Sequence, residues 1–453
     1  MKIRRFLSAF LLIFLLCGLI AVPAGALETP DIQARSALLI DMDTGKMLYG
    51  MNEHSQQYPA STTKVMTALL TLEAVERGEL RLDEIITPEN VTNYNLLGAS
   101  NENIRSGEQI SVENLLYCLL VSSANEAADI LAVRLGGSIA GFAEMMNQRA
   151  AQLGCVDSHF ANPNGMHRDD HYTSAWDLYL ITAEARKHEL FRTICSTISY
   201  TVPATNMSGA RVLHATNSLI SNWRILGYLY QGADGVKTGH TDEAGYCLIA
   251  TATRGDRHLL SVVMGANGEG AHVESFSESA ELLDYGFNQF SVRTVITDTE
   301  LLQEVPVSLS KEANYVVVHP AQAAECLLPN DVDVSTLERK ITLDPALLDQ
   351  DGAVKAPLTE GQVLGTVAVY YDGEACVTVP LQALSGVNAS GFLVGKAAIK
   401  EFLSRRLVQI ALCALLVLIV VIFLWLKFFR RNRRYTGHAR RYRQPTYRGR
   451  RRR

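Results

Sequence analysis

Apolar and polar positions along the chain change their period several times, and each period predicts a different kind of element. Apolar and polar residues alternate over 36–50 on both sides of the turn Asp43-Thr44-Gly45, and this pattern predicts a β-hairpin. Apolar residues then recur at helical spacing over 61–77, until Gly78 ends the pattern. Further helical patterns cover 111–135, 141–153 and 174–187.

Strand-like patterns return after these helices. Three runs, Val236–Thr241, Tyr246–Thr253 and His258–Met264, are separated by the turns Asp242-Glu243 and Gly255-Asp256. Strands at both ends with helices between them predict one α/β domain, whose sheet joins distant parts of the chain. We place this domain at residues 27–288.

The helical signal fades from about residue 290. Short β-rich runs separated by turn residues predict a small all-β domain at 289–384; they are Val305–Leu309, Tyr315–Val318, Val363–Tyr371 and Ala375–Leu381. Glycine, asparagine and serine then become frequent, so we expect residues 385–406 to form a linker or stalk.

Both ends of the chain have the composition of targeting segments. Residues 1–26 carry a basic start, an apolar run and the small residues Ala24-Gly25-Ala26, as a cleavable signal peptide does; an uncleaved anchor is the alternative. Residues 407–426 are apolar and long enough to span a membrane. Residues 427–453 hold Lys427 and twelve arginines, so the positive-inside rule predicts a cytoplasmic tail and an extracytoplasmic body.

Charge and cysteine content narrow the class of protein further. The net charge is −5, but the basic ends conceal an acidic body, because residues 27–426 hold 26 cations and 47 acidic residues, a net −21. Such a body repels phosphates, which disfavours a nucleic-acid-binding core. Six cysteines lie in the body without a C-x-x-C pair, and we expect buried free thiols.

A serine and a lysine at the start of the first predicted helix carry candidate chemistry. Ser61 and Lys64 are three residues apart and therefore share one helix face, so the amine can reach the hydroxyl. A lysine acts as a base only when burial or a neighbouring cation depresses its pKa. The S-x-x-K pattern alone is weak, since Ser308 and Lys311 repeat it in the β-rich domain, where we interpret it as accidental.

Two further motifs make the pattern specific. Ser123-Ala124-Asn125 lies between two helical runs, and Lys237-Thr238-Gly239 begins a predicted strand. S-x-x-K, S-x-N and K-T-G in this order resemble the low-molecular-weight penicillin-binding proteins, the serine-type D-alanyl-D-alanine carboxypeptidases. The resemblance covers about 30–290. It implies the penicillin-binding or serine β-lactamase-like transpeptidase fold, an antiparallel sheet flanked by helices, followed by a small β-domain and a C-terminal anchor.

The resemblance also implies roles for the motif residues. Ser61 would attack the carbonyl of the penultimate D-Ala of a peptidoglycan stem pentapeptide, with Lys64 as its base. Ser123 would relay a proton to the leaving amine, and Asn125 would hold Lys64 and the substrate amide. β-Lactams would acylate Ser61, which would make them inhibitors.

The K-T-G segment would bind the substrate. Lys237 would attract its carboxylate and help to keep Lys64 neutral, and Thr238 would hydrogen-bond that carboxylate. Gly239 would leave room for substrate, and the backbone N–H of His240 would complete an oxyanion hole with that of Ser61. We expect no metal, no cofactor and no nucleic-acid partner.

One position departs from the pattern. Many members of this family carry an arginine near the substrate carboxylate where this chain has Ser275. His272 is a candidate replacement, and carboxylate affinity is in question as a result.

Other functions use similar motifs. A class A-like β-lactamase would need a glutamate-bearing loop near 162–180, which offers only Asp169, Asp170 and Asp177. A transpeptidase or endopeptidase would share every motif. A membrane-anchored covalent sensor of β-lactams or muropeptides, without efficient turnover, is the alternative from another class.

Overall fold

The computed structural model describes residues 29–435, with side chains to residue 430. The predicted signal peptide and most of the predicted basic tail lie outside these residues. The described residues divide into two compact units, one formed by 29–293 and Leu327–Val332 and the other by Thr294–Cys326 and 333–435.

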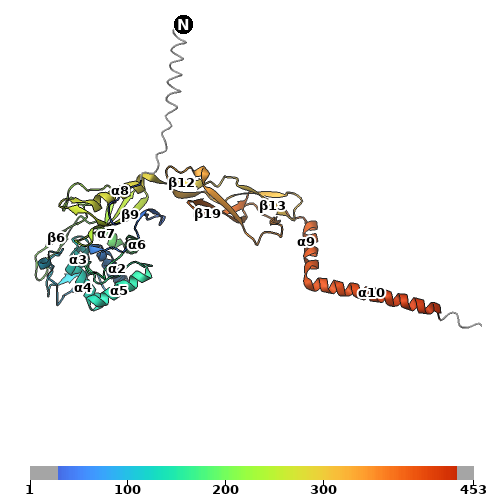
Figure 1. Ribbon diagram of the computed structural model, residues 1–453, viewed down its shortest axis with the longest axis horizontal. Coiled ribbons are helices and arrows are strands. Elements are labelled where there is room, and N and C mark those ends of the chain that lie inside the picture. Colours follow the sequence, from blue (N-terminus) through green and yellow to red (C-terminus); the bar gives the residue numbers. More distant parts are fainter. Residues whose placement is uncertain (1–28, 436–453) are drawn as a thin grey trace, which may run out of the picture. The chain divides into compact units, whose positions relative to one another are not determined.

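A five-stranded sheet forms the centre of the first unit (Figure 1). Its strands follow the order β2 (Met47–Met51), β1 (Ser36–Asp41), β9 (Arg257–Ala266), β8 (Gly245–Arg254) and β7 (Ala233–Thr241). Every neighbouring pair is antiparallel. The predicted hairpin and the three later strands therefore join one sheet, and β7 is left at its edge.

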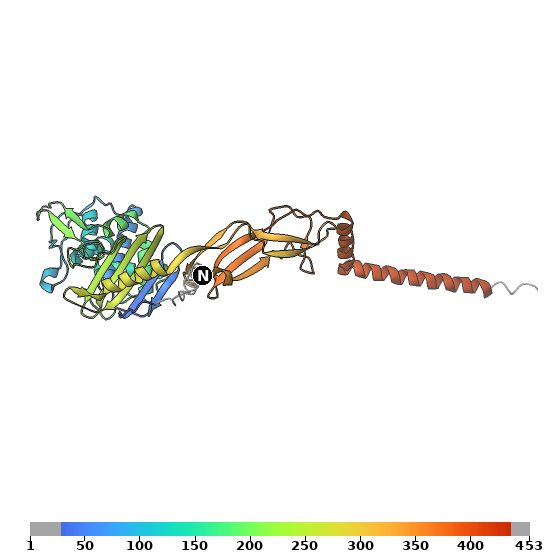
Figure 2. The same ribbon diagram turned by 90° about the horizontal axis from the view of Figure 1, so that it is seen from above.

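Helices cover both faces of this sheet. One face packs on α8 (Glu274–Gln289), which Figure 2 shows lying across the strands. The remaining helices of the unit are η1 (Ala60–Thr63, a 3₁₀ turn), α2 (Lys64–Glu76), α3 (Val112–Leu120), α4 (Asn125–Gly136), α5 (Ile139–Gln152), α6 (Ala175–Ala185), α7 (Glu189–Cys195) and the 3₁₀ turn η2 (Tyr94–Leu97). Three short two-stranded antiparallel sheets complete it: β3 (Ile85–Ile86) with β4 (Ile110–Ser111), β5 (Ser199–Val202) with β6 (Arg211–His214), and β10 (Gly268–Glu269) with β11 (His272–Val273).

Strand β1 shows how the two faces are filled. Leu38 and Ile40 join the core beneath α2, whereas Ala37 and Leu39 join the core beneath α8. All four side chains are fully buried, so β1 is a continuous apolar run rather than the alternating strand expected for this hairpin, because helices cover both of its faces. Close packing of α8 depends on Gly286, because a Cβ there would lie 2.6 Å from Leu259 Cδ1.

The second unit is built on a six-stranded sheet in the order β16-β18-β19-β14-β13-β17. Its strands are β13 (Gln303–Ser308), β14 (Tyr315–Pro320), β16 (Glu338–Leu343), β17 (Val354–Lys355), β18 (Val363–Tyr371) and β19 (Glu374–Ala383), and η3 (Val334–Thr336) is a single turn. β12 (Phe290–Ile296) and β15 (Ala324–Pro329) pair with each other, and each has residues in both units. Along β18, Val367 and Val369 are buried whereas Thr366 and Ala368 beside them are only half-buried, as one covered face requires.

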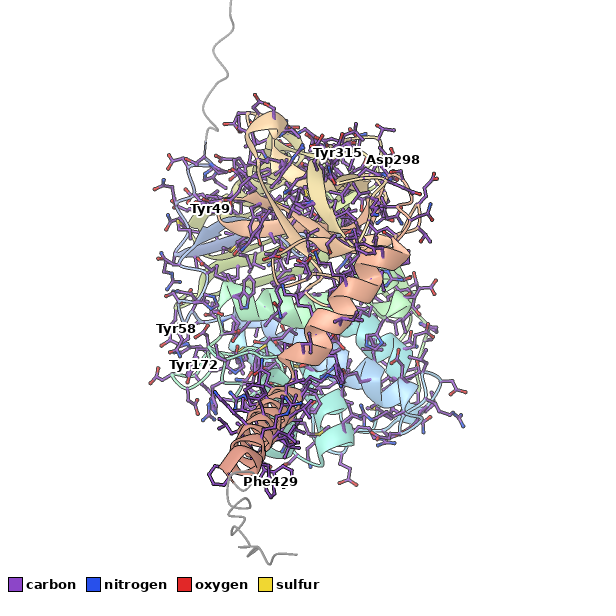
Figure 3. All side chains as sticks on the ribbon, turned by 90° about the vertical axis from the view of Figure 1, so that its right-hand side faces the viewer. Tyr49, Tyr58, Tyr172, Asp298, Tyr315 and Phe429 are labelled. Atoms are coloured by element: carbon purple, nitrogen blue, oxygen red, sulfur yellow. The ribbon has the colours of Figure 1, made fainter. Side chains whose placement is uncertain are left out.

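Two helices follow the second sheet. α9 (Gly391–Ser404) occupies most of the predicted linker, because the helix-forming run after Gly395 outweighs the glycines near its start. α10 (Arg406–Tyr435) contains the one segment of the described residues that is long and apolar enough to cross a membrane, Arg406–Arg430. Figure 3 shows its side chains, Phe429 among them, standing out from the helix.

The cysteines of the first unit match the expectation. Cys118, Cys155, Cys195 and Cys247 are buried free thiols. Burial raises the pKa of the Cys195 thiol to about 12, which keeps it protonated and unreactive. In the second unit Cys376 is only half-buried, in contrast to the expectation.

Candidate active site

The S-x-x-K motif begins the first long helix. Ser61 lies in the 3₁₀ turn η1, and Lys64 is the first residue of α2. One turn of helix separates them, so Lys64 Nζ lies 2.9 Å from Ser61 Oγ. The predicted contact between the amine and the hydroxyl is therefore formed.

Lys64 is completely buried and its amine faces three oxygen atoms. Besides Ser61 Oγ, these are Asn125 Oδ1 and the backbone oxygen of Asn164, each 2.7 Å from Nζ. Burial and then the charge of Lys237 hold the pKa of Lys64 well below its usual value. The two amide oxygens can only accept hydrogen bonds, whereas the hydroxyl can donate one. A neutral amine fits this arrangement, with two N–H groups on the amides and its lone pair toward Ser61.

A buried polar network holds Asn164, and sequence reasoning did not find it. Asn164 Nδ2 donates to Asp129 Oδ1 at 2.9 Å and to the Tyr94 hydroxyl at 2.8 Å, and that hydroxyl donates to Asp129 Oδ2. The three residues come from η2, α4 and the loop before α6, so nothing in their spacing shows that they meet. The network fixes the carbonyl that contacts Lys64.

The S-x-N motif forms the turn between α3 and α4. Ser123 adopts a positive φ of 65°, which breaks the helical pattern predicted for 111–135 into two helices. Asn125 begins α4 and points its Oδ1 at Lys64. Ser123 is buried and lines the same cavity as Ser61.

The K-T-G motif lies on the edge strand β7. Lys237 is buried, and its Nζ donates to the backbone oxygen of Thr238 at 2.9 Å. Burial lowers the pKa of Lys237 to about 7, and the charge of Arg224 adds to this effect. The Thr238 hydroxyl lies 2.7 Å from that of Thr216, a residue that sequence reasoning missed.

Gly239 permits a close approach between β7 and η1. A Cβ at this position would lie 2.9 Å from both the Pro59 carbonyl oxygen and the Ser61 nitrogen. The glycine therefore makes room for η1, and in this way it brings the backbone of β7 against Ser61. The next residue, His240, has an exposed side chain whose ring lies 4.1 Å from that of Tyr246.

A cavity of about 220 Å³ opens over these motifs. It is lined by Ser61, Ser123, Asn125, Thr238, Gly239 and His240, among others, whereas Lys64 and Lys237 lie beneath its walls. Ser275 also lines the cavity and is buried, but His272 is not among the lining residues and its side chain is largely exposed. The cation in the cavity wall is Arg224, which sequence reasoning missed.

Comparison with known proteins identifies the family. The sequence profile of the D-alanyl-D-alanine carboxypeptidase family, Peptidase_S11, matches residues 24–268. The chain belongs to this family. Among the relatives of this S11 carboxypeptidase is DacF, a D-alanyl-D-alanine carboxypeptidase of Bacillus subtilis, which is 31% identical over 362 residues, 80% of this chain and 87% of DacF.

Solved structures support the same assignment of this S11 carboxypeptidase. Penicillin binding protein 5 from Haemophilus influenzae aligns with a TM-score of 0.58 at 29% identity, over 80% of this chain and all of that one. The carboxypeptidase DacD from Francisella tularensis aligns at 0.59 and 25% identity, over 81% and 97%. The predicted family, the penicillin-binding fold and the class of enzyme, a serine-type D-Ala-D-Ala carboxypeptidase, are confirmed.

Proposed function

We propose that the chain removes the terminal D-alanine from peptidoglycan stem peptides that end in D-Ala-D-Ala, with Ser61 as the nucleophile. The observation that carries this assignment is the 2.9 Å contact between Ser61 Oγ and the buried Lys64 amine at the base of a cavity. A lysine with a depressed pKa beside a serine is the arrangement that activates a hydroxyl for attack on a carbonyl.

Acylation follows from this geometry. Lys64 takes the Ser61 proton while Oγ bonds to the carbonyl carbon of the penultimate D-Ala. The negative charge that develops on the carbonyl oxygen is stabilised by the backbone N–H groups of Ser61 and His240; both residues line the cavity, which supports this assignment. When the peptide bond breaks, the Ser123 hydroxyl gives its proton to the leaving amine and takes back the proton that Lys64 received from Ser61, so that Lys64 is neutral again and D-alanine departs.

The remaining motif residues bind and orient the substrate. Asn125 holds Lys64 through its Oδ1 and leaves its amide nitrogen for a substrate carbonyl. Lys237 supplies positive charge beneath the cavity, and the Thr238 hydroxyl is placed to bond the terminal carboxylate. Because β7 is the edge strand, the substrate backbone can also pair with its outer side.

Water then hydrolyses the ester of Ser61 and regenerates the enzyme. A β-lactam carries an amide carbonyl and a carboxylate like those of the dipeptide, so it acylates Ser61 in the same way. A covalent sensor without efficient turnover is not favoured, since the relatives are carboxypeptidases.

The test uses the full chain in detergent. Its intact mass is measured after brief exposure to benzylpenicillin, and D-alanine release is measured from diacetyl-L-Lys-D-Ala-D-Ala. We expect a penicilloyl adduct that is absent from Ser61→Ala and retained in Ser308→Ala, the serine of the second S-x-x-K match, whose Lys311 packs instead over the Phe392 ring. An adduct without D-alanine release contradicts the carboxypeptidase assignment, and the absence of any adduct contradicts Ser61 as nucleophile.

The domain limits and the topology belong to the same proposal. α10 would anchor the chain at residues 407–426, with the catalytic domain (27–288), the β-domain (289–384) and the linker (385–406) outside the bacterial cell membrane and residues 427–453 in the cytoplasm. The apolar helix and the basic residues that follow it support this orientation. Protease added to intact spheroplasts should remove the catalytic domain and leave a C-terminal tag protected; the opposite pattern contradicts the topology.

A further inference from the structure

Arg224 is placed to meet a negative charge in the active-site cavity. It lies on the segment between Ser221 and Tyr230, and it is exposed and lines the cavity. None of the residues that line the cavity in the described part of the chain is an aspartate or a glutamate. In a body of net charge −21, a cavity with an arginine and no acid is suited to an anionic ligand.

The guanidinium of Arg224 is available for such a ligand. Within residues 29–435, no carboxylate lies at ion-pair distance from it, and it donates no hydrogen bond to the protein. A guanidinium has five N–H donors in a planar fork that fits the two oxygens of a carboxylate.

The segment that carries Arg224 is held on both sides of it. Trp223 stacks on His214 of β6, with ring centroids 3.6 Å apart and an interplanar angle of 15°. The Tyr228 hydroxyl accepts a hydrogen bond from the Val273 nitrogen at 3.1 Å, and its ring lies 5.2 Å from that of Phe276. Arg224 is therefore held at the cavity by contacts on either side of it.

The two other cations of the site cannot supply the same charge at the cavity surface. Lys64 and Lys237 are buried beneath the walls, and both have lowered pKa values. Lys237 loses its charge above about pH 7, whereas an arginine stays charged at any pH at which the protein is folded. Burial is the main reason for the lowered pKa of Lys237, and the charge of Arg224 adds to it.

We propose that Arg224 binds the carboxylate of the terminal D-alanine. Arg224 would then provide the positive charge that is missing at position 275, where this chain has a serine. This inference rests on the proposed function, because it names the group that recognises the substrate of that site. Arg224 is a substrate-binding residue, and its contribution appears in affinity for carboxylate-bearing ligands.

The test compares ligands that differ only in this charge. For the full chain in detergent, kcat/KM is measured with diacetyl-L-Lys-D-Ala-D-Ala and with the same peptide as its C-terminal carboxamide. A hydrogen-bonded charge contact is worth about 10- to 100-fold in affinity, so Arg224→Gln should lower the acid-to-amide ratio by about that factor, mainly through KM. Arg224→Lys should retain part of the preference. Arg81→Gln, which removes an exposed arginine paired with Asp83, should change nothing.

A second pair of ligands separates this inference from the proposed function. The rate of adduct formation is measured with benzylpenicillin and with its uncharged methyl ester. If the chain forms the adduct but releases no D-alanine, the carboxypeptidase proposal fails, and the acid-to-ester ratio still decides the role of Arg224. A ratio in Arg224→Gln within about twofold of the parent chain, with either pair, overturns the assignment of Arg224.

Discussion

Replacing Tyr94 by phenylalanine removes one oxygen atom from the network behind Lys64. The hydroxyl donates to Asp129 Oδ2 and accepts from Asn164 Nδ2, and the Tyr94 side chain is only 7% exposed. Asn164 would keep its 2.9 Å bond to Asp129 Oδ1, but one of its N–H groups and one carboxylate oxygen would lose their partners.

The expected loss of stability follows from these two contacts. A hydrogen bond to a charged group contributes about 1.5–3 kcal/mol, and an unsatisfied buried N–H adds to the cost, so we expect a loss of about 2–3 kcal/mol. For a unit of this size that corresponds to a fall in melting temperature of roughly 4–6 °C. Burial raises the pKa of Asp129 and the hydrogen bond from Tyr94 opposes this effect, so the loss of that bond should raise the pKa further.

Catalysis should fall as well, because Asn164 holds Lys64. A loosened Asn164 carbonyl no longer fixes Nζ against Ser61 Oγ, and we expect acylation by benzylpenicillin to slow by about tenfold at pH 7, since small misplacements of reacting groups are costly. The assay is intact mass against time, combined with thermal melting followed by near-UV circular dichroism.

Tyr200→Phe is the matched control. Its hydroxyl donates to Asn114 Oδ1 at 3.0 Å, and its ring stacks on Tyr117, neither of which lines the active-site cavity. We expect about 0.5–1.5 kcal/mol of lost stability with an unchanged acylation rate. If Tyr94→Phe acylates as fast as the parent chain, or if the two variants slow equally, the network does not position Lys64.

Three further results are expected. As the pH rises, kcat/KM on the peptide should increase while Lys64 loses its proton, because Lys64 acts as a base only when it is neutral. Above about pH 7 kcat/KM should decrease, because Lys237 then loses the charge that attracts the substrate carboxylate. A profile that is flat from pH 6 to 9 contradicts this assignment. Gly239→Ala should slow acylation by roughly tenfold to a hundredfold, since the new Cβ displaces η1 or β7, whereas Gly209→Ala, with open space around it, should not; equal rates would refute the close approach. Glu108→Gln should lower the free energy of unfolding, measured by urea titration, by about 3 kcal/mol, because it breaks the buried ion pair between Glu108 and Arg211. A loss below about 1 kcal/mol would show that this ion pair does not stabilise the fold.

The local part of the site could be predicted from the sequence. Ser61 and Lys64 meet because a helix places residues three apart on one face, and this geometry requires no other part of the chain. The apolar periods also located the five strands of the central sheet and the helices α2, α5 and α6, since each period reflects which side of a single element is buried; they did not locate α7 or α8. The limits of the domains stay a prediction.

The tertiary structure alone decided which distant residues complete the site. Asn125 and Asn164 lie 61 and 100 residues from Lys64. Lys237 reaches the site because the strand order places β7 at the sheet edge, where it packs against η1. The Tyr94–Asp129 contact and the placement of Arg224 at the cavity left no local signal, because neither depends on the period of its own segment. Sequence patterns record the burial of an element, whereas contacts between elements are set by how the whole core packs.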